Sequence, residues 1–138
     1  MSRRKLQRKI ITPPKIKGFT IFGPAKKRTE RIRLFLEEYE AIRLLDRENL
    51  TQEEAAVHME VSRPTLTRIY ENARKKVAKS LVEGVDLIIS GGEYLFDETW
   101  YRCENCKANF NVFEGQDHRC PVCKSTEIVS LNEYFAED

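Results

Sequence analysis

The sequence lacks the features that define several large classes of protein. No apolar run approaches the roughly 18 residues that a membrane-spanning helix requires. The basic N-terminus is not followed by the apolar segment of a secretory signal, so we expect a cytoplasmic protein with no membrane partner. The sequence has no glycine-rich phosphate loop and no G-x-S-x-G motif, and no group of residues resembles a catalytic site. We therefore expect a protein that is not an enzyme.

Cysteine is absent from the first 102 residues, and all four cysteines lie in the tail. Cys103 and Cys106 form one C-x2-C pair, and Cys120 and Cys123 form a second pair after thirteen intervening residues. Such a pair lets a tight turn aim both sulfurs at one point, and two of these knuckles complete a tetrahedral four-thiolate site. A tail of about 40 residues buries too little apolar surface to fold alone, which favours a structural metal.

Zinc is the first choice of metal for this site, and an iron centre of rubredoxin type is the second. The thirteen-residue gap is short for rubredoxin. Zinc ribbons, however, more often have glycine directly after each pair, where this chain has Lys107 and Lys124. His118 is a further potential ligand, although four thiolates favour a surface position for it. Two disulfides are the remaining alternative, which the reducing cytoplasm disfavours.

Charge is segregated along the chain, although the net charge is only +2. Residues 1–33 contain 12 Lys/Arg and one acid, and residues 34–61 carry a net charge of −6. Residues 62–83 return to +4, and residues 84–138 carry −7. A basic arm and a basic helix on either side of an acidic helix suit contact with a polyanion. The alternative is that the basic N-terminus only increases solubility.

Residues 51–83 have the pattern of two helices joined by a turn of three to four residues. Thr51 and Glu54 form a capping box, which predicts that the first helix begins there. A second helix over residues 62–83 is capped by Ser62, or by Arg63 with a proline at its first position. The pair predicts a helix-turn-helix that binds DNA, and a helical hairpin with a solvated basic face is the alternative.

The second helix combines an apolar stripe with a basic outer face. Its apolar residues recur with the helical period, and its basic residues point the opposite way. We expect DNA contacts from three groups of residues: base-edge or nearby phosphate contacts from Arg63, Thr65, Thr67 and Arg68, phosphate contacts from Lys75, Lys76 and Lys79, and minor-groove contacts from Arg3, Arg4 and Lys5.

The remaining segments complete the expected architecture. Residues 1–31 read as a basic, extended arm. A short strand at Ile32 and Leu34 and a helix over the EEYEAIRLLD segment precede the helix pair, and residues 87–96 read as a β-hairpin with a Gly-Gly turn. We expect a mostly α fold, in which a helix-turn-helix domain at residues 32–92 is followed by a small β zinc ribbon at residues 93–138.

Several motifs resemble a known family. They are the basic start Arg3–Lys5, Phe22–Pro24, EYEAIRLLD at 38–46, QEEAA at 52–56, VSRPTLTRI at 61–69, ARKKVAKSLVEG at 73–84 and Gly91–Gly92. Together they resemble a poorly characterised family of small predicted DNA-binding proteins of bacteria and archaea. The resemblance implies a helix-turn-helix similar to region four of sigma factors, hence DNA binding and a transcriptional role. Members usually have glycine in place of Glu60, and the four-cysteine tail is not part of the family's core.

We therefore expect a sequence-specific DNA-binding protein, a transcription regulator that reads the major groove of double-stranded DNA with helix 62–83 and holds one zinc ion. Two alternatives are a zinc-ribbon adaptor that docks on the transcription machinery, such as RNA polymerase, and an iron-binding or redox-sensing four-thiolate protein. We also expect a homodimer, with Leu81, Val82 and the strands at 87–96 as candidate contacts.

Overall fold

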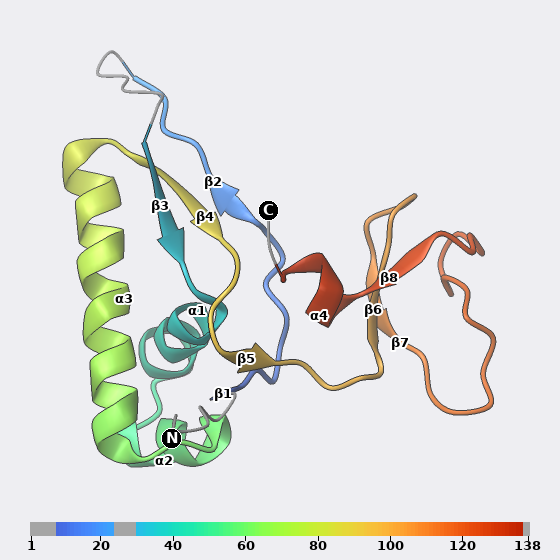
Figure 1. Cartoon of the computed structure of the whole chain (residues 1–138), viewed down its shortest axis with the longest axis horizontal. Coiled ribbons are helices and arrows are strands. Elements are labelled where there is room, and N and C mark those ends of the chain that lie inside the picture. Colours follow the sequence, from blue (N-terminus) through green and yellow to red (C-terminus); the bar gives the residue numbers. More distant parts are fainter. Residues whose placement is uncertain (1–7, 24–29, 137–138) are drawn as a thin grey trace, which may run out of the picture. The chain divides into compact units, whose positions relative to one another are not determined.

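The computed structural model describes residues 8–23 and 30–136, which fall into two compact units, Met1–Leu95 and Phe96–Asp138 (Figure 1). Of the described residues, 37% are helical and 20% lie in the strands of three small sheets. The prediction of a mostly α fold is therefore wrong, because the chain has an α/β fold. The described strands are two to four residues long, too short to leave a clear alternating pattern in the sequence. Arg3, Arg4 and Lys5 lie outside the described residues.

The helices of the first unit follow one another in the order α1 (Leu36–Ile42), the π-helical turn η1 (Arg43–Arg47), α2 (Gln52–Met59) and α3 (Arg63–Glu83). The capping box at the start of α2 is confirmed, since Thr51 Oγ1 accepts the N–H of Glu54 and the Glu54 carboxylate accepts the N–H of Thr51. Ser62, and not Arg63, is the N-cap of α3. Gly84 ends α3 in the left-handed conformation, with φ of 69°.

The turn between α2 and α3 is centred on a left-handed residue. Glu60 has φ of 57° and ψ of 44°, and its N–H donates to the carbonyls at the end of α2. The N–H of Val61 also donates to the carbonyl of Ala56, so the turn satisfies two carbonyls of the last turn of α2, those of Ala56 and Val57. Because a left-handed L-residue costs about 1 kcal/mol relative to glycine, the turn keeps the geometry that glycine would favour despite the side chain of Glu60.

A three-stranded sheet packs against α3 (Figure 1). Its strands lie in the order β2 (Gly18–Phe19), β4 (Asp86–Ile89) and β3 (Arg31–Leu34), with β4 parallel to β3 and antiparallel to β2. The expected strand at Ile32 and Leu34 is confirmed, and both side chains are buried. Gly18 is required where β2 meets β4, because a Cβ atom there would lie 2.1 Å from the carbonyl oxygen of Leu87.

The predicted β-hairpin at residues 87–96 is wrong. β5 (Tyr94–Leu95) pairs in parallel with β1 (Arg8–Lys9), not with β4, whose two edges are taken by β2 and β3. The glycine pair instead lets the chain pass close to α1, since a Cβ atom on Gly92 would lie 2.2 Å from a carboxylate oxygen of Glu37. The same pairings correct the predicted arm, because its residues 8–19 contribute β1 and β2 and bury Ile10 within the fold.

Three glutamates of α1 are buried and link separate segments of the first unit. In sequence they contribute to an acidic block, but their relative exposures are only 0 to 7%. Burial raises the pKa of Glu37, although the N–H of Glu93 and the charge of Arg8 oppose this shift. Glu37 accepts a hydrogen bond from the N–H of Glu93. Glu38 accepts hydrogen bonds from the N–H of Phe35 and from Lys76 Nζ. Glu40 accepts hydrogen bonds from the N–H of Ile11 and from the Arg43 guanidinium.

The second unit is a small antiparallel sheet followed by one helical turn. Its strands are β6 (Trp100–Cys103), β7 (Asn109–Asn111) and β8 (Ile128–Ser130), in the order β7-β6-β8, and α4 (Leu131–Tyr134) follows. Phe96 and Phe135 pack with ring centroids 5.6 Å apart, and the Asn132 side chain bonds both the N–H and the carbonyl of Phe96. These contacts close the apolar end of the unit.

Candidate metal centre and nucleic-acid interface

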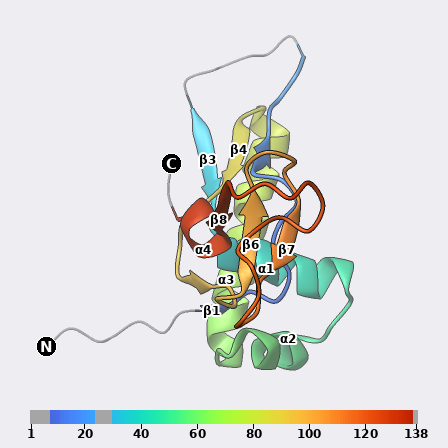
Figure 2. The ribbon, with the colours of Figure 1, turned by 90° about the vertical axis from the view of Figure 1, so that its right-hand side faces the viewer.

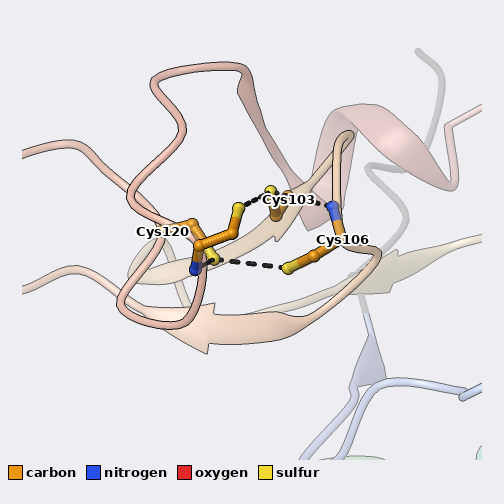
Figure 3. A group of neighbouring side chains, drawn as sticks. Cys103, Cys106 and Cys120 are labelled. Atoms are coloured by element: carbon orange, nitrogen blue, oxygen red, sulfur yellow. Dashed lines mark hydrogen bonds between the residues drawn. The ribbon is translucent and has the colours of Figure 1, made fainter.

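The four cysteines lie together in the second unit (Figure 3). Their sulfurs are all within 4.8 Å of one another, with 3.5 Å between Cys103 and Cys123 and 3.5 Å between Cys106 and Cys120. Four sulfurs at 2.3 Å from a central zinc would be about 3.8 Å apart at the corners of a tetrahedron. The two S–S distances of 3.5 Å are close to this value and no separation exceeds 4.8 Å, so the four side chains could hold a metal ion.

Each cysteine pair lies in a knuckle, a tight turn in which backbone N–H groups point at sulfur. The N–H of Cys106 donates to Cys103 Sγ at 3.4 Å, and the N–H of Cys123 donates to Cys120 Sγ at 3.5 Å. The residue after each knuckle is left-handed, with φ of 70° at Lys107 and 66° at Lys124. The two knuckles thus repeat one geometry, and lysine takes the position at which zinc ribbons more often have glycine.

The surroundings of the sulfurs shift the pKa values of Cys106, Cys120 and Cys123 in different directions. The side-chain amide of Asn105 donates to Cys123 Sγ and contributes most to lowering the pKa of this thiol to about 6. Burial raises the pKa of Cys120, but backbone N–H groups of its own knuckle outweigh burial and lower it. The N–H of Ala108 lowers the pKa of Cys106, but desolvation and the neighbouring thiols raise it to about 12. A bound cation would therefore favour the thiolate of Cys106, whose pKa is otherwise raised.

The cluster is closed on its inner side. Cys103 and Cys120 are fully buried, whereas Cys106 is exposed and Cys123 is half-buried. His118 is exposed, and its ring lies 5.7 Å from the ring of Tyr101, which agrees with the expected surface position. Four thiolates fill a tetrahedral site completely, so a metal here would have no open position for water or substrate.

The residues expected to contact base edges lie in the first turns of α3, where α2 packs against it (Figure 2). Arg63 is exposed and forms an ion pair with Glu53 of α2, with 2.5 Å between Arg63 Nη1 and Glu53 Oε1. The hydroxyl of Thr67 donates to Gln52 Oε1 at 2.6 Å. The start of α2 is thus tied to the first turns of α3. Gln52 and Glu53 are not among the site residues expected from the sequence, although they directly follow the predicted capping residue Thr51.

The remaining α3 residues that were expected to contact DNA differ in their exposure and in the groups that they contact. Arg68 is exposed and Thr65 half-buried, and Arg68 Nη2 donates to Thr65 Oγ1 at 3.3 Å. Lys75 is exposed, as is Lys79, which lies 3.3 Å from Glu30 Oε1. Lys76 is different, because it pairs with buried Glu38 and its Nζ lies 3.8 Å from the centre of the Phe35 ring. Lys76 therefore holds α3 against α1, which corrects its expected role as a phosphate contact.

The described part of the basic N-terminal segment starts beside α2. β1 contacts α2 and is anchored to the loop before β5, where Arg8 forms an ion pair with Glu93. The N–H of Ile11 donates to buried Glu40, which fixes the segment further along. The described part of this segment therefore begins beside α2, and residues 1–7 lie outside the described residues.

These observations define a protein of two units, an α/β unit in which a short turn joins α2 to α3 and a small β unit whose four clustered cysteines could hold a metal ion. The described residues contain no helix that is both long and apolar enough to span a membrane. The chain belongs to the family described as "Protein of unknown function DUF134", whose profile matches residues 1–97. The matched region ends close to the boundary between the two units.

Relatives in the same family are similar over more than the first unit. A UPF0251 protein of Clostridium novyi is 40% identical over 134 residues, covering 96% of this chain and 91% of the relative. A UPF0251 protein of Caldicellulosiruptor saccharolyticus is 46% identical over 110 residues, covering 80% of this chain and 77% of the relative. A third, from Halothermothrix orenii, is 40% identical over 128 residues, covering 89% of this chain and 95% of the relative. No solved structure matches the chain.

Proposed function

We propose that this chain is a sequence-specific DNA-binding protein that acts as a transcription regulator and reads the major groove of double-stranded DNA with α3. One observation carries the proposal. A capped helix and a left-handed turn present Arg63, Thr65 and Arg68 on the first turns of a 21-residue helix. The first turns of the second helix are where helix-turn-helix proteins contact base edges, and arginine is the side chain most often used to read guanine.

The charge along α3 supports the same orientation. Lys75 and Lys79 are exposed further along the helix, where they would lie near phosphates if the first turns entered the groove. The partners of Arg63 and Lys79 are themselves exposed, so water or phosphate can replace these ion pairs at little cost.

The basic N-terminal segment offers a second contact. Seven residues upstream of β1 can reach at most roughly 25 Å, and their join with the fold lies beside α2. We propose that Arg3, Arg4 and Lys5 contact an adjacent minor groove or its phosphates. Deleting residues 1–7 removes these three charges and keeps β1, so the slope of log K against log salt should shrink by up to about 2.7. An unchanged slope would exclude the segment from the interface.

For the second unit we propose one zinc ion per chain, held by Cys103, Cys106, Cys120 and Cys123 as a structural metal. The closed donor set supports a structural role over a catalytic one. Iron is the alternative ion for the same four thiolates. Elemental analysis of protein prepared without chelator distinguishes the two, as does colour, because ferric four-thiolate centres are red and zinc centres are colourless.

The DNA proposal is tested by selecting genomic fragments that bind the purified full-length chain and repeating the binding at increasing salt. We expect enriched fragments that share a sequence, with an affinity that falls steeply as salt rises. A chain that retains no fragment at low salt would overturn the proposal.

The acidic second unit, with nine Asp/Glu and four Lys/Arg in residues 96–138, favours the adaptor alternative. Capture of RNA polymerase components without DNA retention would support that alternative.

We further propose a homodimer on two half-sites, because one helix-turn-helix contacts too little DNA for high specificity. Leu81 and Val82 remain candidate contacts, since they are 80% and 81% exposed. The strands at 87–96 are weaker candidates, because both edges of β4 are already paired. Light scattering of the free protein and of its DNA complex tests this proposal, and a monomer in both measurements would reject it.

A further inference from the structure

The two knuckles end in the same residue type in the same unusual conformation. Lys107 follows Cys106 with φ of 70°, and Lys124 follows Cys123 with φ of 66°. Glycine would adopt this conformation without the cost of about 1 kcal/mol that an L side chain incurs. Because the strain recurs at equivalent positions of both knuckles, it indicates that the lysine side chains contribute something that glycine lacks.

Both lysine side chains fold back onto their own knuckles. Lys107 Nζ donates to the carbonyl oxygen of Glu104 at 2.8 Å, and Lys124 Nζ donates to the carbonyl oxygen of Pro121 at 3.4 Å. Glu104 and Pro121 occupy the same place, directly after the first cysteine of each pair. The two ammonium groups are thus held against the two loops that carry the four sulfurs.

The negative charge around the four cysteines indicates what Lys107 and Lys124 contribute. Four thiolates around a divalent ion carry a formal charge of −2, and the surrounding residues 96–138 contain nine Asp/Glu against four Lys/Arg. Arg102 is one of those four basic residues, and its guanidinium lies over the ring of Tyr134 at 4.8 Å. Lys107 and Lys124 are two more of the four, and their ammonium groups are hydrogen-bonded to the loops that carry the cysteines.

We propose that Lys107 and Lys124 are charge-compensating residues of the four-cysteine centre. Their ammonium groups offset the negative charge of the metal-bound thiolates, which strengthens metal binding and makes the sulfurs less nucleophilic. The centre should therefore retain its metal ion, and its sulfurs should react slowly with electrophiles. This inference rests on the metal site proposed above and adds the residues that tune it.

The test uses the full-length chain loaded with zinc. A chromophoric chelator that competes for the ion gives the relative zinc affinity, and N-ethylmaleimide gives the rate of thiol alkylation. Replacing either lysine by glutamine should weaken zinc binding about two- to fivefold and accelerate alkylation by a similar factor. Replacing both should combine the two effects. Lys107→Arg and Lys124→Arg should restore both readouts, and the differences should narrow in high salt.

Three control variants separate the effect of the lysine charges from that of the left-handed backbone strain and from that of the net charge of the chain. Glu104→Gln removes the opposite charge from the same knuckle, so it should tighten zinc binding and slow alkylation. Lys107→Gly removes charge and strain together, so its zinc affinity should exceed that of Lys107→Gln. Lys75→Gln, in the other unit, should change neither readout.

The outcomes distinguish this inference from the proposed metal site. A wild-type chain that takes up no zinc would overturn both. A zinc-loaded chain whose glutamine variants match the wild type, or in which arginine fails to restore the readouts, would overturn only the role of the two lysines. Weaker zinc binding in Glu104→Gln would also contradict compensation by charge.

Discussion

The core of the first unit is assembled from apolar side chains on different helices, whereas sulfur supplies much of the core of the second. The helical core of the first unit consists of Ala41, Leu44, Ala55, Ala56, Met59, Leu66 and Ile69. In the second unit the core around the sheet consists of Cys103, Phe110, Val112 and Cys120, so half of its buried members are candidate metal ligands. The first unit thus resembles an ordinary small domain, whereas the second has a small apolar core, so we expect its stability to depend on a metal bound by its sulfurs.

The two units also use charge differently. The first unit buries carboxylates of α1 and satisfies them with backbone N–H groups, an arginine and a lysine. The second unit leaves most of its acids exposed, and its buried ionisable groups are thiols. Loss of a metal and loss of a buried carboxylate should therefore damage different parts of the chain, which allows the comparison to be tested one unit at a time.

Metal removal should have the largest effect. Cys106→Ser, or chelation of the wild type, should unfold the second unit, because structural zinc contributes about 10–16 kcal/mol to small metal-dependent folds. Trp100 starts β6 and should become exposed to solvent, with a red shift of its fluorescence. Far-UV circular dichroism should keep most of the helical signal, which comes from α1, α2 and α3.

Val122→Ser is the matched control for metal removal, since Val122 lies in a knuckle but its side chain is 71% exposed. It should keep the metal and the tryptophan spectrum. Loss of the helical signal in Cys106→Ser would show that the first unit depends on the metal as well. Loss of DNA affinity in a Cys106→Ser chain with intact helices would place the second unit at the DNA.

The next effect should come from Glu40, which is fully buried and pairs with Arg43 while accepting the N–H of Ile11. Glu40→Gln should lower the free energy of unfolding of the first unit by about 2–3 kcal/mol, because it removes the buried carboxylate that pairs with Arg43. Urea unfolding followed by circular dichroism measures this change. Glu48 also pairs with Arg43, at 3.7 Å, but is half exposed, so Glu48→Gln should change stability by less than about 0.5 kcal/mol. Equal effects of the two substitutions would mean that Glu40 does not act as a buried link.

The features that could be predicted from the sequence are those that local chemistry determines. The capping box at Thr51, the N-cap Ser62 and the terminator Gly84 each act within four residues, and the structure has all three. The two C-x2-C pairs are local in the same way, because each knuckle closes through its own N–H···S bonds. Their association was predictable since a tetrahedral site needs four ligands.

The features that could not be predicted depend on partners far along the chain. β1 is only two residues long and exists because it pairs with β5, some 86 residues later. The Gly91–Gly92 pair favours a hairpin locally, but β2 and β3 occupy both edges of β4 and leave β5 to pair elsewhere. The glutamates of α1 resemble a solvated acidic face because the sequence does not reveal which N–H groups will reach them.

A smaller effect, confined to DNA, should distinguish base contacts from phosphate contacts on α3. Arg68→Ala should weaken binding to the preferred site by about 1–3 kcal/mol and affect random DNA less. Lys75→Ala should weaken binding to both kinds of DNA by a similar factor, because a phosphate contact carries no sequence information. Competition gel shifts with the selected site and with random DNA give the two affinities. An equal loss for Arg68→Ala on both would assign Arg68 to phosphate.

The smallest effect should come from the turn between α2 and α3. Glu60→Gly relieves a left-handed strain of about 1 kcal/mol, and part of this gain is offset because glycine makes the unfolded chain more flexible, by about 0.4–1 kcal/mol. The first unit should therefore gain roughly 0.5 kcal/mol in free energy of unfolding. Glu60→Ala removes the same charge and keeps the strain, so it should not stabilise the unit, and thermal melts of the two variants separate geometry from charge. If alanine stabilised the unit as much as glycine, the gain would come from removing an acid near α3, and the left-handed conformation of Glu60, with φ of 57°, would carry no measurable strain.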